Sequence, residues 1–130
     1  MLLVKTCLAP SRIHGMGLFA AEAIPRGTPF WCFEPGFDQA IAPDRLASLP
    51  ELTQQHIRWF AWLSPSDAHY ILSGDFCCFM NHAAQPNTGA PPGVQSPVTT
   101  IALRDIAQGE ELTCDYFAFD AEARQKLGLE

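Results

Sequence analysis

Short apolar runs separated by turn residues dominate the pattern of this chain. Runs rich in strand-forming side chains occupy residues 2–8, 30–33, 69–72 and 98–103. Glycine and proline mark turns at 24–29, 35–36 and 74–75. The pattern predicts many short strands joined by tight turns.

The stretch from residue 42 to residue 63 has a helical period instead. Pro43 and Asp44 can begin a short helix. An approximately helical apolar stripe follows, formed by Leu52, Ile57, Phe60, Ala61 and Leu63. We expect Trp59 and Trp62 beside it to serve as core or interface anchors, because aromatic side chains mostly serve burial.

A second, shorter helix is expected near the end of the sequence. Asp120 can cap a helix over residues 121–127, with Gly128 at its C-terminal end. One mid-chain helix, one short C-terminal helix and several short strands predict a mostly β or α+β domain.

Composition agrees with this fold class. The 130 residues are 48% hydrophobic and include eleven prolines, which suits one globular domain with a single core and many short elements. The apolar run at residues 1–4 is too short for a secretory signal or a membrane span, so we read it as part of a first strand and expect no membrane association.

Charge and cysteine content narrow the classes of partner. The formal net charge is −6 with eight unclustered Lys and Arg, which disfavours direct binding of nucleic acid and favours a basic partner. The five cysteines are odd in number and form no C-x-x-C pair, and the four histidines are scattered. We therefore expect no metal site, no disulfide framework and a reducing, cytoplasmic setting.

Two short motifs carry candidate chemistry. Asn81 and His82 follow the apolar run 76–80, and a buried amide and imidazole are costly unless each finds partners, so the pair is either a turn with an ordinary core histidine or part of a polar site. Gly15 and Gly17 permit close approach of the backbone to a ligand, although a hairpin or bulge explains such a pair as well.

Three motifs in one order make the pattern specific: Gly15-Met16-Gly17, then Asn81-His82 with Pro86-Asn87, then 104–116 ending in Asp115-Tyr116. This order resembles the SET domain of protein-lysine methyltransferases, from about Lys5 to about Asp120, and is similar to the compact single-domain versions of bacteria and viruses. The resemblance implies small curved β-sheets and a C-terminal pseudoknot that brings Asn81-His82 beside Tyr116. It leaves residues 121–130 as a short helix and tail.

The resemblance also implies a function, the methylation of a lysine in a protein substrate, possibly a basic histone-like tail, with S-adenosylmethionine as donor. Tyr116 matches the catalytic tyrosine that lines the methyl-transfer pore. The implied donor-binding residues are His14, Gly15, Met16, Gly17, Asn81, His82, Tyr116 and Phe119. The implied walls of the substrate lysine channel are Phe33, Tyr70, Cys114 and Phe117.

The chain departs from the family pattern after Asn81-His82. The family usually has Ser-Cys there, whereas this chain has Ala83-Ala84, and no cysteine-rich tail follows Tyr116. We therefore expect no zinc-bound lid, and a lysine channel closed by the C-terminal helix or by a second subunit in a homodimer. Cys114 stands where relatives often carry Phe or Tyr, so its small side chain predicts room for di- or trimethylation.

Two other functions are compatible with parts of the sequence. A non-catalytic SET-like module that binds a peptide or another subunit would account for Ala83-Ala84. A Cys–His hydrolase could use Cys77 or Cys78 with His82, but the sequence offers no third orienting residue or oxyanion motif.

Overall fold

A computed structural model describes residues 1–94 and 99–129. Its strands are β1 (Thr6–Pro10), β2 (Met16–Ala20), β3 (Pro29–Cys32), β4 (Gln39–Ile41), β5 (Trp62–Leu63), β6 (Tyr70–Leu72), β7 (Asn81–His82), β8 (Thr88–Gly89), β9 (Thr99–Ala102) and β10 (Thr113–Cys114). Its helices are α1 (Pro43–Ala47), α2 (Glu51–Phe60), η1 (Phe76–Phe79), η2 (Tyr116–Ala118) and α3 (Ala123–Lys126). The predicted mostly β fold is confirmed; Val98 of the predicted strand 98–103 lies outside the described residues.

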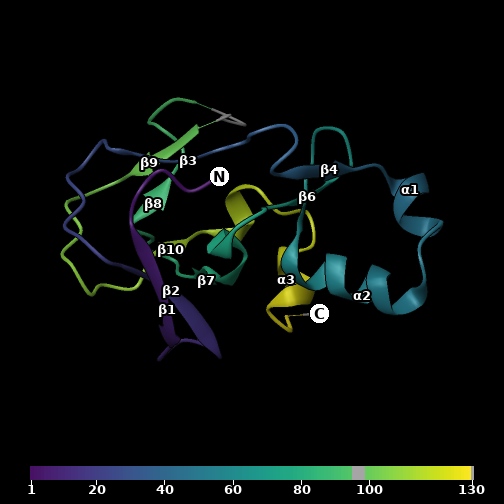
Figure 1. Ribbon diagram of the computed structural model, residues 1–130, viewed down its shortest axis with the longest axis horizontal. Coiled ribbons are helices and arrows are strands. Elements are labelled where there is room, and N and C mark those ends of the chain that lie inside the picture. Colours follow the sequence, from purple (N-terminus) through teal and green to yellow (C-terminus); the bar gives the residue numbers. More distant parts are fainter. Residues whose placement is uncertain (95–98, 130) are drawn as a thin grey trace.

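The described strands form four small sheets. Two are pairs, the antiparallel β1–β2 hairpin and the parallel β7–β10 pair, and two have three strands, in the orders β3–β9–β8 and β4–β6–β5. Helices α1 and α2 lie at one end of the molecule, and the hairpin projects from the opposite half (Figure 1). The sheet strands are short because proline and glycine turns interrupt them, as the pattern predicts.

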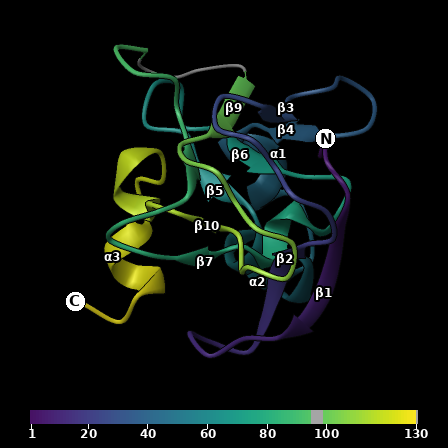
Figure 2. The ribbon, with the colours of Figure 1, turned by 90° about the vertical axis from the view of Figure 1, so that its left-hand side faces the viewer.

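The β7–β10 pair determines where the Asn81-His82 motif and the motif that ends in Tyr116 meet in space. Asn81 lies opposite Thr113 and His82 opposite Cys114, in parallel register. Figure 2 shows the two strands side by side in the middle of the fold. The C-terminal segment therefore runs beside Asn81-His82, as the resemblance implied.

The mid-chain helix prediction was wrong in its extent. Residues 42–63 contain two helices, α1 and α2, since Pro50 lies between them and disfavours helical geometry at the residue before it. The second helix ends at Phe60 because Ala61 is extended, with φ −90° and ψ 162°. Leu52, expected on the buried stripe, is 79% exposed.

Two hydrophobic clusters replace the single expected core. The larger contains, among other residues, Leu18 of the hairpin, Phe30 of β3, and Ile24, Ile106 and Leu112 from the connecting segments. The smaller contains Ile41, Leu46, Ile57, Ala61 and Tyr70. The second cluster exists because α1, α2 and the β4–β6–β5 sheet bury their apolar faces against one another. No helix in residues 1–94 and 99–129 is long and apolar enough to cross a membrane.

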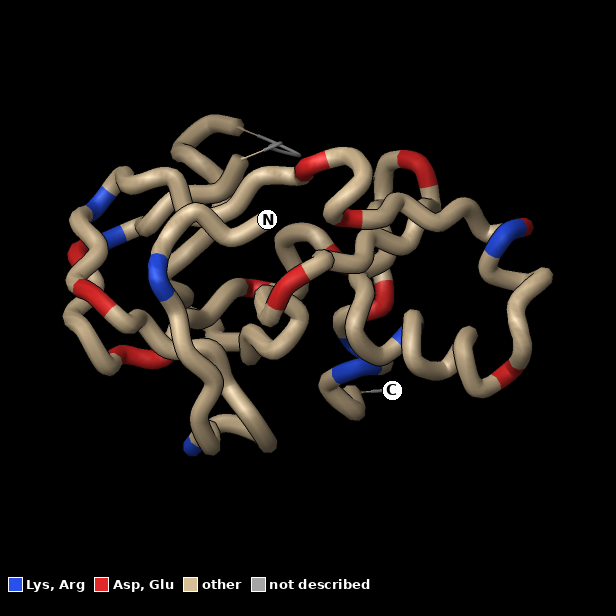
Figure 3. Tube along the Cα trace, viewed as in Figure 1, with Lys and Arg blue, Asp and Glu red and all other residues tan. Residues whose placement is uncertain are grey.

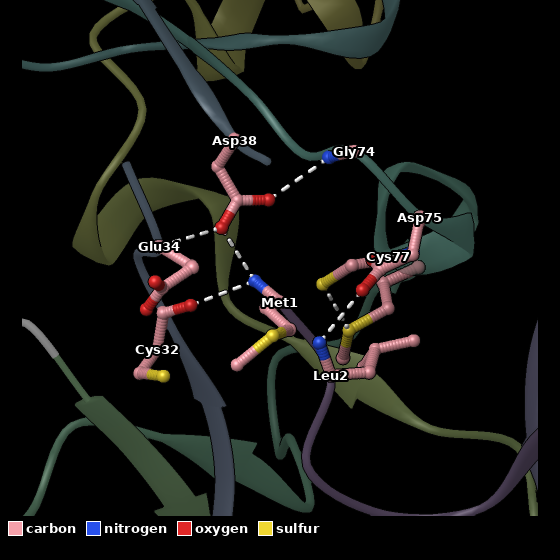
Figure 4. A network of polar contacts seen from close by, with 9 residues as sticks. Met1, Leu2, Cys32, Glu34, Asp38, Gly74, Asp75 and Cys77 are labelled. Atoms are coloured by element: carbon pink, nitrogen blue, oxygen red, sulfur yellow. Dashed lines mark hydrogen bonds and ion pairs between the residues drawn. The ribbon is translucent and has the colours of Figure 1, made fainter. Parts of the chain in front are cut away.

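Asp38 anchors the first residues to the fold (Figure 4). Its fully buried carboxylate accepts from the Met1 ammonium (2.7 Å), the Glu34 amide (2.8 Å) and the Gly74 amide (2.9 Å). Burial raises the pKa of Asp38, but the bonds from the ammonium and the two amides outweigh it and hold the pKa below its usual range.

We expect Asp38→Asn to lower the free energy of unfolding at pH 7 by about 1–3 kcal/mol, because an amide cannot replace the charge-assisted bond to Met1. A lowered folded-state pKa stabilises the protein above the unfolded pKa of about 3.9, and this stabilisation is lost as pH falls through the folded value. Urea unfolding at pH 7 and pH 3 should therefore show a smaller difference in the free energy of unfolding between the native chain and Asp38→Asn at pH 3. An equal difference at both pH values would contradict the assignment.

Candidate active site

One cleft of about 1350 Å³ is lined by elements from both ends of the molecule. It is bordered by the tip of the β1–β2 hairpin, β3, the end of α2, η1, β7 and the segment from Cys114 to α3. Its walls are largely apolar and include the aromatic residues Phe33, Trp31, Trp62, Phe79 and Phe119. The motifs that the sequence singled out meet along this cleft.

Asn81 joins the hairpin to β7. Its buried Nδ2 donates to the carbonyl oxygens of His14 (3.0 Å) and Met16 (3.3 Å) and to Glu111 Oε1 (2.9 Å). These contacts supply the polar partners that a buried amide requires. The amide thus fixes the backbone on both sides of Gly15.

Glu111 is the residue that sequence reasoning missed. Its carboxylate accepts from Ser11 Oγ (2.7 Å to Oε1), and Ser11 Oγ in turn accepts from the Ile13 amide (2.9 Å). A Cβ added at Gly17 would lie 2.3 Å from Glu111 Oε1. Gly17 therefore lies behind the cleft wall, where its missing side chain leaves room for this carboxylate.

Gly15 faces open space at the tip of the hairpin. Its φ of +49° is a value that side chains rarely adopt, and an added Cβ would meet nothing within 4 Å. The bond from Ser11 N to Gly15 O (2.8 Å) closes the turn. Bare backbone is thus presented to the cleft at this point.

His82 and Tyr116 are held together across the β7–β10 pair. His82 Nδ1 accepts from the Tyr116 amide (3.2 Å), which places the hydrogen of the neutral ring on Nε2. The His82 ring lies 5.4 Å from the rings of both Tyr116 and Phe117. The predicted proximity of Asn81-His82 to Tyr116 is thus seen in the side chains.

The Tyr116 hydroxyl is a fixed donor. It donates to the carbonyl oxygen of Met80 at 2.5 Å. Burial raises the pKa of Tyr116 well above its usual range, and the nearby Cys114 and Asp120 add to the shift. The hydroxyl therefore stays protonated at neutral pH and cannot act there as a phenolate base.

The cysteines near the cleft are thiols and not thiolates. Burial raises the pKa of Cys114 to about 12 and also raises the pKa of Cys77 and Cys78. Because the thiolate is the reactive form, this environment disfavours the Cys–His hydrolase alternative. Residues 1–94 and 99–129 contain no group of three His, Cys, Asp or Glu side chains placed to bind a metal ion.

The structure brings together most of the predicted site residues. Those that line the cleft are His14, Gly15, Met16, Phe33, Asn81, His82, Cys114, Tyr116 and Phe119. Tyr70 lies instead in the smaller core cluster, where its hydroxyl donates to Glu122 (2.7 Å), and Phe117 is 51% exposed. Tyr70 and Phe117, which the resemblance assigned to the wall of the lysine channel, therefore do not line this cleft.

Comparison with known proteins agrees with the geometry. The chain is 30% identical over 121 residues to "Histone-lysine N-methyltransferase 2D" of Homo sapiens and, equally, to that of Mus musculus. The match covers 91% of this chain but only 2% of each relative.

Solved structures share the fold at low identity. The Chaetomium thermophilum Polycomb Repressive Complex 2 bound to GSK126 aligns with a TM-score of 0.66 and 21% identity, over 96% of this chain and 17% of that one. A second structure, "ctPRC2 in an autoinhibited conformation bound to S-adenosylmethionine", aligns with a TM-score of 0.64 and 21% identity, over 96% of this chain and 16% of that one. The family model of the SET domain matches residues 15–117. The chain therefore belongs to the SET domain family.

Proposed function

We propose that this chain transfers methyl groups from S-adenosylmethionine to a lysine side chain of a protein substrate. One observation carries the proposal: a single cleft is lined by the Gly15 hairpin tip, Asn81-His82 and the protonated Tyr116. The human and mouse relatives, named as histone-lysine methyltransferases, support it.

The residues of the cleft fit the donor. Bare backbone at Gly15, held by Asn81, suits a polar amino-acid end, and the ring faces near His82 and Phe119 suit an adenine. When bound, S-adenosylmethionine supplies a methyl group on a positively charged sulfur. The chain's own task is to hold donor and amine in line and to exclude water.

The cleft walls also favour the reactive form of the substrate. A lysine in water has a pKa of about 10.4, so at pH 7 the neutral amine costs about 4–5 kcal/mol. Apolar walls such as Phe33 and Trp62 lower this cost because they disfavour the ammonium ion. The protonated Tyr116 orients the reacting groups, and no strong general base is required.

A basic protein is the proposed class of substrate. The net charge of −6 favours a basic partner, and Figure 3 shows Lys and Arg dispersed along the chain trace. A histone-like tail has the required lysines and charge.

Two measurements test the proposal together. Calorimetry should detect binding of S-adenosylmethionine to the purified protein, and labelled donor should transfer its methyl group to a basic protein such as a histone mixture. Donor binding without transfer to any lysine-containing protein would favour the non-catalytic binding module. Absence of donor binding would remove the proposal.

Glu111→Ala should weaken donor binding about tenfold or more, because it removes charge-assisted bonds that fix the hairpin tip. Calorimetry measures the change. Glu110→Ala is the matched control, because the neighbouring carboxylate pairs with the exposed Arg104. Equal donor affinity in the two variants would contradict the role assigned to Glu111.

Cys114 should set the number of methyl groups added. Its small neutral thiol lines the cleft, so we expect di- or trimethylated product from the native chain. Cys114→Phe should shift the product toward monomethyllysine, since a larger side chain fills the space that added methyl groups require. Mass spectrometry of a methylated peptide measures this. Monomethyl product alone from both proteins would refute it.

A further inference from the structure

The cleft already contains a buried cation that belongs to the chain. Lys126 Nζ lies 2.6 Å from Asp120 Oδ2 and also donates to the carbonyl oxygen of Ala61. The Lys126 side chain is only 13% exposed, and all three residues line the cleft. A lysine ammonium is rarely buried unless it is paired.

Asp120 is held in place without the help of Lys126. Its Oδ1 accepts from the backbone amides of Leu63 (3.1 Å) and Glu122 (2.9 Å), and the bond from Ala121 N to Leu63 O (2.9 Å) fixes the adjoining backbone. The other oxygen, Oδ2, is the one that meets the ammonium. The carboxylate would therefore keep its position if the ammonium left.

This ion pair lies at the tyrosine end of the cleft. Phe119, next to Asp120 in the chain, has its ring 6.2 Å from that of Tyr116 and 5.6 Å from that of Trp62. Besides burial, the charge of Asp120 contributes to the raised pKa of Tyr116 and of Cys114. The cation site and the proposed reaction centre are therefore electrostatic neighbours.

The element that carries Lys126 is short. Helix α3 spans four residues and has no side-chain cap, and a single helical turn is marginal without tertiary contacts. Removing one partner of a buried ion pair is costly, but exchanging one ammonium for another preserves the pairing. We propose that Asp120 and the Ala61 carbonyl form a cation-binding subsite, filled by Lys126 in the free protein and by the side chain of a basic residue of the protein substrate in the complex.

The first test does not depend on methyl transfer. Lys126→Met removes the ammonium but keeps an unbranched side chain, so the melting temperature of this variant should fall. Added n-butylammonium should raise the melting temperature of the variant more than it raises that of the native chain. The neutral n-butanol should not act in this way. Arg124→Met, which removes an exposed charge from the same helix, should melt as the native chain does and show no such rescue. Rescue that persists when Asp120→Asn is added would overturn the subsite.

The second test rests on the proposed function. With the internal cation removed, the KM for a lysine-rich peptide should fall about tenfold in Lys126→Met relative to Arg124→Met. Rescue by n-butylammonium with an unchanged KM would refute the substrate role alone. Rescue without methyl transfer in any variant would keep the subsite and remove the proposed function. If Lys126→Met does not fold, Lys126→Gln takes its place, and absence of rescue in that variant overturns the subsite.

Discussion

Tyr116→Phe is expected to slow methyl transfer at least about 100-fold while S-adenosylmethionine affinity changes less than about threefold. The substitution removes only the hydroxyl, which is protonated and fixed by the Met80 carbonyl, and keeps the ring that packs against His82 and Phe119. A donor group placed where charge changes during reaction affects the rate more than it affects binding of the ground state.

Single-turnover transfer of labelled methyl to a basic protein measures the rate, and calorimetry measures donor affinity. Tyr70→Phe is the matched control, because its hydroxyl also makes one bond, to Glu122, but lies outside the cleft. Native turnover in Tyr116→Phe would remove the assigned role. An equal loss in Tyr70→Phe would show that the effect comes from general destabilisation.

Asn87→Ala should lower the free energy of unfolding by about 3 kcal/mol, the largest effect on stability that we expect from one substitution. The side chain of Asn87 is buried and accepts from the Thr113 amide (2.8 Å) while it donates to the Glu111 carbonyl (2.8 Å). Alanine would leave the buried Thr113 amide and the part-buried Glu111 carbonyl without these partners. The affected segment is the one that holds β10 beside β7.

Urea unfolding, with the slope of the transition compared between variants, measures this loss. Gln85→Ala removes an exposed amide two residues earlier and should change stability by less than about 0.5 kcal/mol. If Asn87→Ala also lowers the free energy of unfolding by less than about 0.5 kcal/mol, the backbone groups of Glu111 and Thr113 find other partners.

The sequence was sufficient to place Asn81, His82 and Tyr116 together, because three ordered motifs resemble one family. It was insufficient for Glu111, whose partner Ser11 is distant along the chain and whose residue type fits any turn. The position of Tyr70 in the smaller core cluster could not be predicted for a related reason. An aromatic side chain in a short strand suits a core and a channel equally, and only the packing of α2 decides between them.

The limits of the helix between residues 42 and 63 show a second kind of error. Pro50, which the apolar spacing through Leu63 does not register, divides this stretch into α1 and α2. Leu63, the last residue of that stripe, is extended in β5 together with Trp62, whose ring centroid lies 5.3 Å from that of Trp31. Periodicity in a single sequence cannot separate a last helical turn from a strand that follows it directly.

The parallel pairing of β7 with β10 also has a consequence for how the protein folds. Asn81 cannot meet Thr113 until the intervening chain has closed a long loop, and such non-local parallel contacts form slowly. Since β10 leads directly into Tyr116, a chain that has not yet formed this pairing also lacks the contact between His82 and Tyr116. The proposed methyl transfer should therefore not recover during refolding before β7 and β10 have paired.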